Sequence, residues 1–139
     1  MNYYLGEDLY MIVKAVDFEK NFMRFIKKKG FKTLSSQIKE LSDKLNRGEF
    51  EGDKITHRDE PTPYDVYKLR LPIPDIKVGK SNGYRVIYMV VTETKIVVLL
   101  IIYYKKEQPA VSETYIKGLI DGYFLNSMAE EDEDEIEEF

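Results

Sequence analysis

The stretch from residue 66 to residue 104, VYKLRLPIPDIKVGKSNGYRVIYMVVTETKIVVLLIIYY, decides the fold. It contains three apolar runs, 66–71, 84–91 and 95–104, separated by a Pro/Gly-rich segment and by a short polar turn. The first run alternates apolar and basic residues, as a half-solvated strand does. The third is apolar on both faces, which is typical of a strand covered on both sides. The sequence therefore predicts three consecutive strands in an antiparallel meander.

Two helices are predicted ahead of this meander. Leu9–Val16 is rich in apolar and β-branched residues and indicates a first strand, after which Asp17 is a candidate N-cap. Apolar residues then recur at helical spacing in two segments that stop at Gly30 and Gly48. They are Phe18, Phe22, Phe25 and Ile26 in the first segment, and Leu34, Ile38, Leu41 and Leu45 in the second. The short connection predicts an αα-hairpin.

The remaining segments complete an α+β domain. Residues 48–65 form a polar loop in which we expect a short strand, and residues 112–126 have the apolar spacing of a last helix. We therefore expect an N-terminal strand, an αα-hairpin, a three-stranded meander and a C-terminal helix, with the helices packed on a mainly antiparallel sheet. Residues 1–128 are predicted to be the folded domain. The acidic segment 129–139 is predicted to be a disordered tail.

The composition points to a cytoplasmic protein without a metal or cofactor. The 139 residues include no cysteine and one histidine, His57, so neither a disulfide framework nor a thiolate metal site is expected. The first residues lack the features of a secretory signal, and the longest apolar run, Ile96–Tyr104, is too short for a membrane helix. We expect no membrane partner.

The net charge of −4 hides two regions of opposite sign. Residues 130–138 contain eight acidic residues and no basic one, whereas residues 1–128 carry a net charge of +4. Residues 66–106 contain eight basic and two acidic residues, a net charge of +6. A local cationic field of this kind favours a polyanionic partner, either nucleic acid or an acidic protein segment.

The segments YKLRL at 67–71 and GKSNGYRVIY at 79–88 resemble the YKLRL and GKSGGYRVIY segments of RelE/ParE-family toxins of type II toxin-antitoxin systems. Residues 99–106, LLIIYYKK, are similar to the end of the last central strand of this family. The resemblance covers roughly residues 9–126. It implies either ribosome-associated mRNA cleavage, as in the favoured RelE branch, or inhibition of DNA gyrase, as in the ParE branch. It also implies a cognate antitoxin protein as a partner.

The resemblance also implies which residues act. Lys68 and Arg70 match the basic pair of the second strand, Arg85 matches the arginine of the GYR motif, and Lys106 falls near a basic position after the last strand. These four are the candidate catalytic residues. Ser112 stands where some members place a tyrosine. Apart from the resemblance, the candidate RNA-binding residues are Lys77 and Lys80 in the Pro/Gly loop, and Tyr104 and Lys105 at the end of the last strand.

Clustered cations suit RNA cleavage without a metal. In that reaction the 2′-hydroxyl attacks its own phosphate, which requires a proton acceptor, a donor to the leaving oxygen and cations for the added charge. Repulsion within such a cluster lowers the pKa of a lysine and so helps proton exchange. Two other interpretations stay open: a gyrase inhibitor without a nuclease site, and an inactive relative that only binds a protein. The segment Gly79-Lys80-Ser81 is not a P-loop, because the upstream glycine is missing.

Overall fold

The computed structural model describes residues 9–55 and 62–137, the side chains as far as residue 126. The chain forms two compact units, Met1–Pro109 and Ala110–Phe139. The first contains the whole sheet and two helices, and the second contains the last helix. Among the described residues, no helix is both long enough and apolar enough to cross a bilayer.

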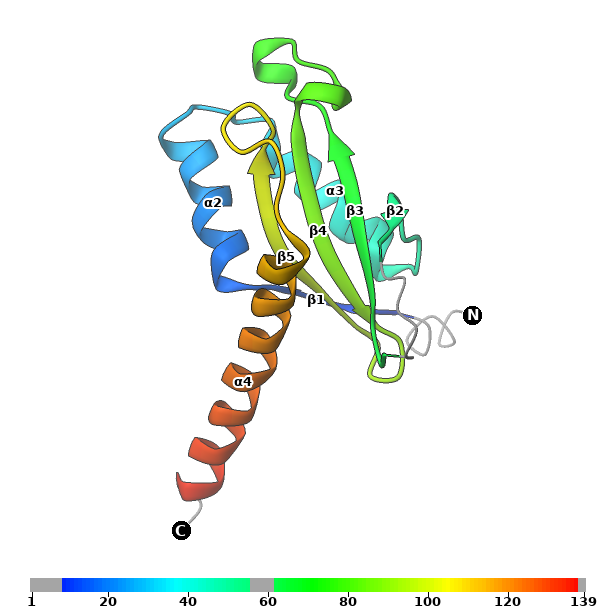
Figure 1. The fold of residues 1–139 in the computed structure, drawn as a ribbon, viewed down its shortest axis with the longest axis vertical. Coiled ribbons are helices and arrows are strands. Elements are labelled where there is room, and N and C mark those ends of the chain that lie inside the picture. The colour runs from blue at the N-terminus through cyan, green and yellow to red at the C-terminus, as the bar shows by residue number, and fades with distance from the viewer. Residues whose placement is uncertain (1–8, 56–61, 138–139) are drawn as a thin grey trace, which may run out of the picture. The chain divides into compact units, whose positions relative to one another are not determined.

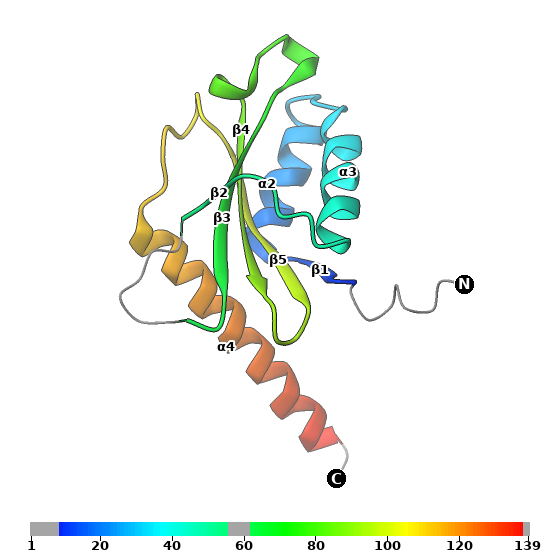
Figure 2. The same cartoon turned by 90° about the vertical axis from the view of Figure 1, so that its right-hand side faces the viewer.

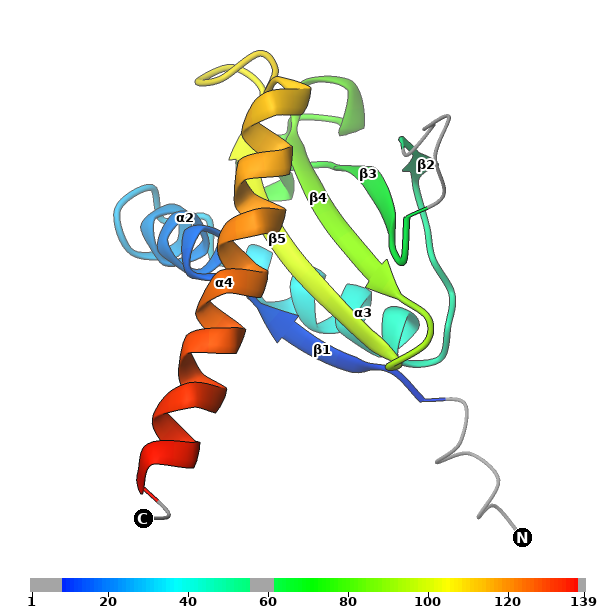
Figure 3. The ribbon, with the colours of Figure 1, turned by 60° about the horizontal axis from the view of Figure 1, so that its bottom comes forward.

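The described strands form one five-stranded sheet in the order β1-β5-β4-β3-β2 (Figure 3). They are β1 (Met11–Lys14), β2 (Asp53–Lys54), β3 (Asp65–Leu71), β4 (Tyr84–Val91) and β5 (Ile96–Tyr104). The predicted meander β3-β4-β5 is confirmed, and so is the short strand in the polar loop, which is β2. β1 pairs with β5 in parallel, while the other pairs are antiparallel. The sheet is therefore mixed but mainly antiparallel, as expected for the α+β class.

Helices α2 (Val16–Lys27) and α3 (Leu34–Asn46) cover one face of this sheet (Figures 1 and 2). Both predicted apolar stripes face the core, because their members are buried or packed against buried residues. The buried members are Phe18, Phe25, Leu34, Ile38, Leu41 and Leu45. The predicted αα-hairpin is thus confirmed.

The beginning of α2 corrects one prediction. Ala15 is the N-cap, no side chain caps this end, and Asp17 lies within the first turn. The strand ends earlier than expected, at Lys14, so the helix begins before Asp17 is reached. The carboxylate of Asp17 still lies near the positive end of the helix dipole.

A glycine makes the sharp connection between the two helices possible. Gly30 has a φ of 72°, a left-handed conformation that costs a residue with a Cβ atom free energy. The amide of Phe31 then donates to the carbonyl of Phe25 at 3.0 Å, which satisfies one of the free carbonyls at the end of α2. The ring of Phe31 turns into the core against Tyr84 and Tyr104, at centroid distances of 6.2 and 6.1 Å.

Helix α4 runs from Glu113 to Glu137, well past the end expected near Asn126. Its first turn is capped by Ser112, whose hydroxyl accepts from the amide of Tyr115 at 3.0 Å. The helix continues into the acidic segment that was expected to be disordered. Glutamate and alanine have high helix propensity, which favours this continuation although like charges at i,i+4 spacing oppose it.

Candidate nucleic-acid interface

Two of the candidate catalytic residues lie side by side on the sheet. The register places Arg70 of β3 opposite Arg85 of β4, and Arg85 opposite Tyr103 of β5. Directly opposed side chains point to the same face, so these three residues form one row. Their sequence neighbours Leu69, Tyr84 and Tyr104 belong to the core beneath the helices, so the row lies on the other face. Lys68 lies on the same face as Arg70, opposite Ile87.

Arg85 is directed at the protein backbone. Its guanidinium donates to the carbonyl oxygens of Lys80 at 2.8 Å, Ser81 at 2.9 Å and Tyr84 at 3.1 Å, and the residue is only 4% exposed. Burial, and then the neighbouring charge of Arg70, lowers the pKa of Arg85. Arg85 therefore organises the turn formed by residues 80–82. Arg70, by contrast, is exposed.

That turn requires Gly83 where it meets the sheet. A Cβ atom at Gly83 would lie 2.1 Å from the carbonyl oxygen of Leu71, so a larger residue would push the backbones apart. The carbonyl of Gly83 accepts from the amide of Lys105 at 3.0 Å, and the ammonium of Lys105 donates to Ser81 at 3.1 Å. Arg85 and Lys105 thus converge on the same turn, from β4 and from the end of β5.

A hollow of about 460 Å³ opens beside this turn. Its volume lies within the range of small-ligand sites, roughly 300–1,000 Å³. It is lined by Val78, Asn82, Tyr104, Lys105, Lys106 and Pro109. Three of the eight candidate residues therefore meet at the hollow, while Lys77 and Lys80 lie in the turns that lead to it. Lys68 and Arg70 belong to the sheet face beside Arg85.

The segment that carries Lys77 and Lys80 is held by helix α3. Asp75 accepts from the amide and the hydroxyl of Thr33, at 3.0 and 3.1 Å. The side-chain amide of Gln37 donates to the carbonyl of Pro72 at 2.9 Å. Asp75, an acidic residue within the cationic stretch, is thereby used to fix the loop.

The candidate cations have no acidic partner in the part of the chain that the structure describes. No ion pair joins Lys68, Arg70, Lys77, Lys80, Lys105 or Lys106 to a described acidic residue. Their charges remain available to a polyanion. Among the described residues, no group of three acidic or histidine side chains could hold a metal ion. His57 lies outside the described residues.

A second cationic surface was missed in the sequence. Residues 20–39 contain seven basic residues and no acidic one, a net charge of +7 that exceeds the charge of residues 66–106. We call its exposed or half-exposed members on α2 and in the connection after it the cationic corner: Lys20, Arg24, Lys27, Lys28, Lys29 and Lys32. A charge count along the chain would have found it.

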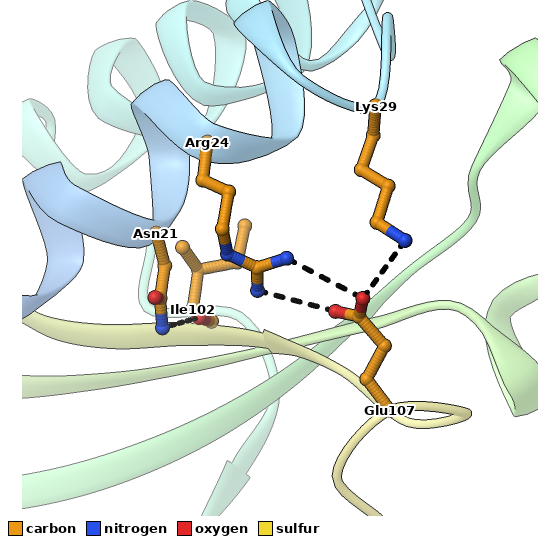
Figure 4. Close-up of polar contacts among 5 residues, drawn as sticks. All are labelled: Asn21, Arg24, Lys29, Ile102 and Glu107. Carbon is orange, nitrogen blue, oxygen red and sulfur yellow. Dashed lines mark hydrogen bonds and ion pairs between the residues drawn. The ribbon is translucent and has the colours of Figure 1, made fainter.

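One carboxylate, that of Glu107, contacts two members of the cationic corner (Figure 4). Glu107 accepts from both terminal nitrogens of Arg24, at 3.2 and 3.3 Å, and from the ammonium of Lys29 at 3.1 Å. Since Glu107 directly follows Lys106, the corner lies close to the lysines of the hollow. A turn held by Arg85, a hollow with two lysines and an adjoining cationic corner together define a candidate interface for a polyanion.

Comparison with known proteins adds a similarity of fold. No family model matches the chain, and no curated protein matches it. The chain is similar to an arginine-to-alanine double mutant of the E. coli toxin RelE in the free state, with 18% identity and a TM-score of 0.49, over 73% of this chain and 88% of that chain. It is also similar to the isolated E. coli RelE toxin, with 20% identity and a TM-score of 0.47, over 81% of this chain and 97% of that chain. At these values the similarity carries no weight for function, which we infer from the residues of the chain itself.

Proposed function

We propose that the chain is the toxin of a toxin-antitoxin module and acts as a metal-independent endoribonuclease that inhibits translation. The observation that carries this proposal is the hollow lined by Tyr104, Lys105 and Lys106, whose two ammonium groups have no acidic partner among the described residues. Cations in a partly enclosed site stabilise the extra negative charge that develops on a phosphate under attack. The resemblance of residues 67–71 and 79–88 to RelE-type toxins supports the same class.

The reaction follows from the RNA itself. The 2′-oxygen loses its proton, forms a bond to the adjacent phosphorus, and expels the 5′-oxygen of the next nucleotide, which takes up a proton. The products are a 2′,3′-cyclic phosphate and a free 5′-hydroxyl. DNA lacks the 2′-hydroxyl and cannot react in this way.

We assign the residues to three roles. Lys106 and Lys105 stabilise the phosphate at the hollow, and Tyr104 forms part of its wall. Lys68 and Arg70 bind a neighbouring part of the RNA backbone on the sheet face. Arg85 acts mainly by holding the turn of residues 80–82, because its donors are used on backbone carbonyls.

The partners in this proposal are a cognate antitoxin protein and RNA, free or on the ribosome, and the setting is the cytoplasm.

Induced expression of the chain should stop the growth of a bacterial host, and co-expression of a neighbouring small antitoxin should restore it. The Lys106→Ala variant should lose most of this inhibition. Lys54→Ala, which removes an exposed lysine paired with Asp65 at 3.2 Å, is the matched control and should remain inhibitory.

Purified protein distinguishes the possible targets. Incubation with RNA, with and without ribosomes, should give fragments that end in a 2′,3′-cyclic phosphate. A supercoiling assay with DNA gyrase should show no inhibition. Gyrase inhibition without RNA cleavage would replace this proposal with the ParE-type activity. Binding of an antitoxin without either activity would identify an inactive relative.

A further inference from the structure

Lys106 lies between two residues, Lys105 and Glu107, that are both held in place by contacts with other parts of the chain. This segment begins where β5 ends, with the amide of Lys105 bonded to Gly83. The amides of Glu107 and Gln108 then both donate to the carbonyl of Tyr104, at 3.0 and 2.9 Å, which closes a tight turn. Lys106 therefore stands between Lys105, which is bound to the turn of residues 80–82, and Glu107.

Glu107 ties this turn to helix α2. The two oxygens of its carboxylate each accept from one terminal nitrogen of Arg24, a bidentate geometry that fixes direction as well as distance. Lys29 adds a contact of 3.1 Å from the connection after the helix. Nearby, the side-chain amide of Asn21 donates to the carbonyl of Ile102 at 2.8 Å, so α2 holds the end of β5 as well (Figure 4).

The bridge does not cancel the charge of the hollow. Burial by itself would raise the pKa of Glu107, but hydrogen bonds from Arg24 and Lys29 outweigh it and lower the pKa. The carboxylate is therefore ionised at neutral pH. It is matched by two cations, so the group of three keeps a net charge of +1 beside the phosphate site.

We propose that Glu107 is a positioning residue, which holds Lys106 in place at the hollow through its bridge to Arg24 and Lys29. This inference rests on the proposed function and adds to it a residue that does not touch RNA. Exposed ion pairs contribute little to folding stability, because solvent screens them. The bridge therefore acts on the position of Lys106 and not on folding stability. A displacement of about 1 Å in a catalytic group can lower a rate by about 100-fold.

The Glu107→Gln variant separates positioning from simple electrostatics. Removal of a negative charge beside the site should by itself strengthen RNA binding and leave cleavage equally fast. If Glu107 positions Lys106, kcat for cleavage of a labelled RNA oligonucleotide should instead fall by about tenfold or more, with KM unchanged or lower. The matched control is Glu49→Gln, which removes an exposed ion pair to Arg47 of 2.7 Å and should change neither constant.

A double-mutant cycle shows whether Glu107 acts through Lys106. Combined with Lys106→Ala, the change Glu107→Gln should cause no further loss, because the group to be positioned is gone. Independent losses that multiply would overturn the inference. Glu107→Asp, which keeps the charge, should restore part of kcat. All variants should keep the thermal midpoint of the parent chain, and in Glu107→Gln the backbone amide of Lys106 should show a lower NMR order parameter.

The outcomes distinguish this inference from the proposed function. If the unchanged protein cleaves no RNA under any condition, the proposed function itself fails. If Lys106→Ala lowers kcat while Glu107→Gln leaves kcat unchanged, the function stands and the positioning role is excluded.

Discussion

At the scale of single residues, the two arginines that face each other across β3 and β4 differ in what they contact. Arg85 donates to the carbonyls of Lys80 and Ser81 and is almost fully buried. Arg70 is exposed and has no ion-pair partner among the described acidic residues. The two opposed arginines therefore have different roles: Arg85 is structural, and Arg70 is available to a ligand.

This difference gives the first prediction. Arg85→Ala should lower the free energy of unfolding by about 1–3 kcal/mol, because it removes the hydrogen bonds to three carbonyls, one of them in the buried residue Tyr84. Arg70→Ala should change it by less than about 0.5 kcal/mol. It should weaken RNA binding and reduce its salt dependence by about one unit of slope or less. Urea titrations and RNA binding at several salt concentrations measure both effects. An Arg85→Ala variant as stable as the parent would show that the turn does not depend on this side chain.

Buried tyrosines make stability depend on alkaline pH. Burial, with a smaller contribution from the charge of Asp75, raises the pKa of Tyr84, and burial raises the pKa of Tyr88 as well. In the unfolded chain these hydroxyls ionise near pH 10, whereas the folded chain keeps them protonated. The stabilisation is therefore complete below about pH 10 and is lost as the pH rises further.

Tyr84→Phe tests this dependence. The hydroxyl of Tyr84 has no hydrogen-bond partner among the described residues, so its removal should leave stability at pH 7 unchanged or raise it. The loss of stability between pH 9 and pH 11, measured by urea titration at each pH, should become shallower. An unchanged slope in this range would show that Tyr84 does not cause it.

At the scale of secondary-structure elements, the α2–α3 hairpin packs on the sheet from which the strands of the candidate interface come. Leu41 of α3 is only 4% exposed and belongs to the core. Leu41→Ala should lower the free energy of unfolding by about 2–5 kcal/mol, because it removes a buried side chain and leaves a cavity. The control Lys39→Ala, an exposed change on the same helix, should cost less than about 0.5 kcal/mol. A loss below that value for Leu41→Ala would show that Leu41 is not buried between α3 and the sheet.

Apolar periodicity was enough to predict most elements, because burial of a stripe or a face determines them. It predicted the hairpin, the meander and the turn at Gly30. Contacts made by polar groups could not be predicted in this way. Nothing in the sequence shows that Arg85 would bind backbone carbonyls, because this depends on how the turn of residues 80–82 folds. Nor does the sequence show that Ala15 would replace Asp17 as the cap, because this depends on where strand β1 ends.

The C-terminal end of α4 also differs from the prediction, which placed it near Asn126. The charge run 130–138 suggested a disordered tail, yet the helix continues to Glu137. Helix propensity and charge repulsion oppose each other there, and a charge count alone does not decide between them.

At the scale of the whole molecule, charge is divided between the two compact units. Residues 1–109 carry a net charge of +5 and residues 110–139 a net charge of −9, so the overall value of −4 describes neither. Within the first unit the cationic corner, the hollow and the sheet face with Arg70 offer cations to a polyanion. Tyr104, Lys105 and Lys106 were candidates from the sequence, and the structure brings them together at the hollow. The cationic corner is visible in the basic residues of 20–39, whereas the bridge at Glu107 needed the tertiary contact between α2 and the end of β5.

The proposed function rests on one reaction, the cleavage of RNA through its 2′-hydroxyl. The most direct test uses an RNA oligonucleotide that the protein cuts, with ribosomes if they are required, and the same oligonucleotide with one 2′-deoxy substitution at the nucleotide before the cut. We predict a 2′,3′-cyclic phosphate on the product of the first and no cleavage at the substituted bond of the second. Equal cleavage of both oligonucleotides, or no cleavage of either RNA by folded protein, would contradict the proposed function.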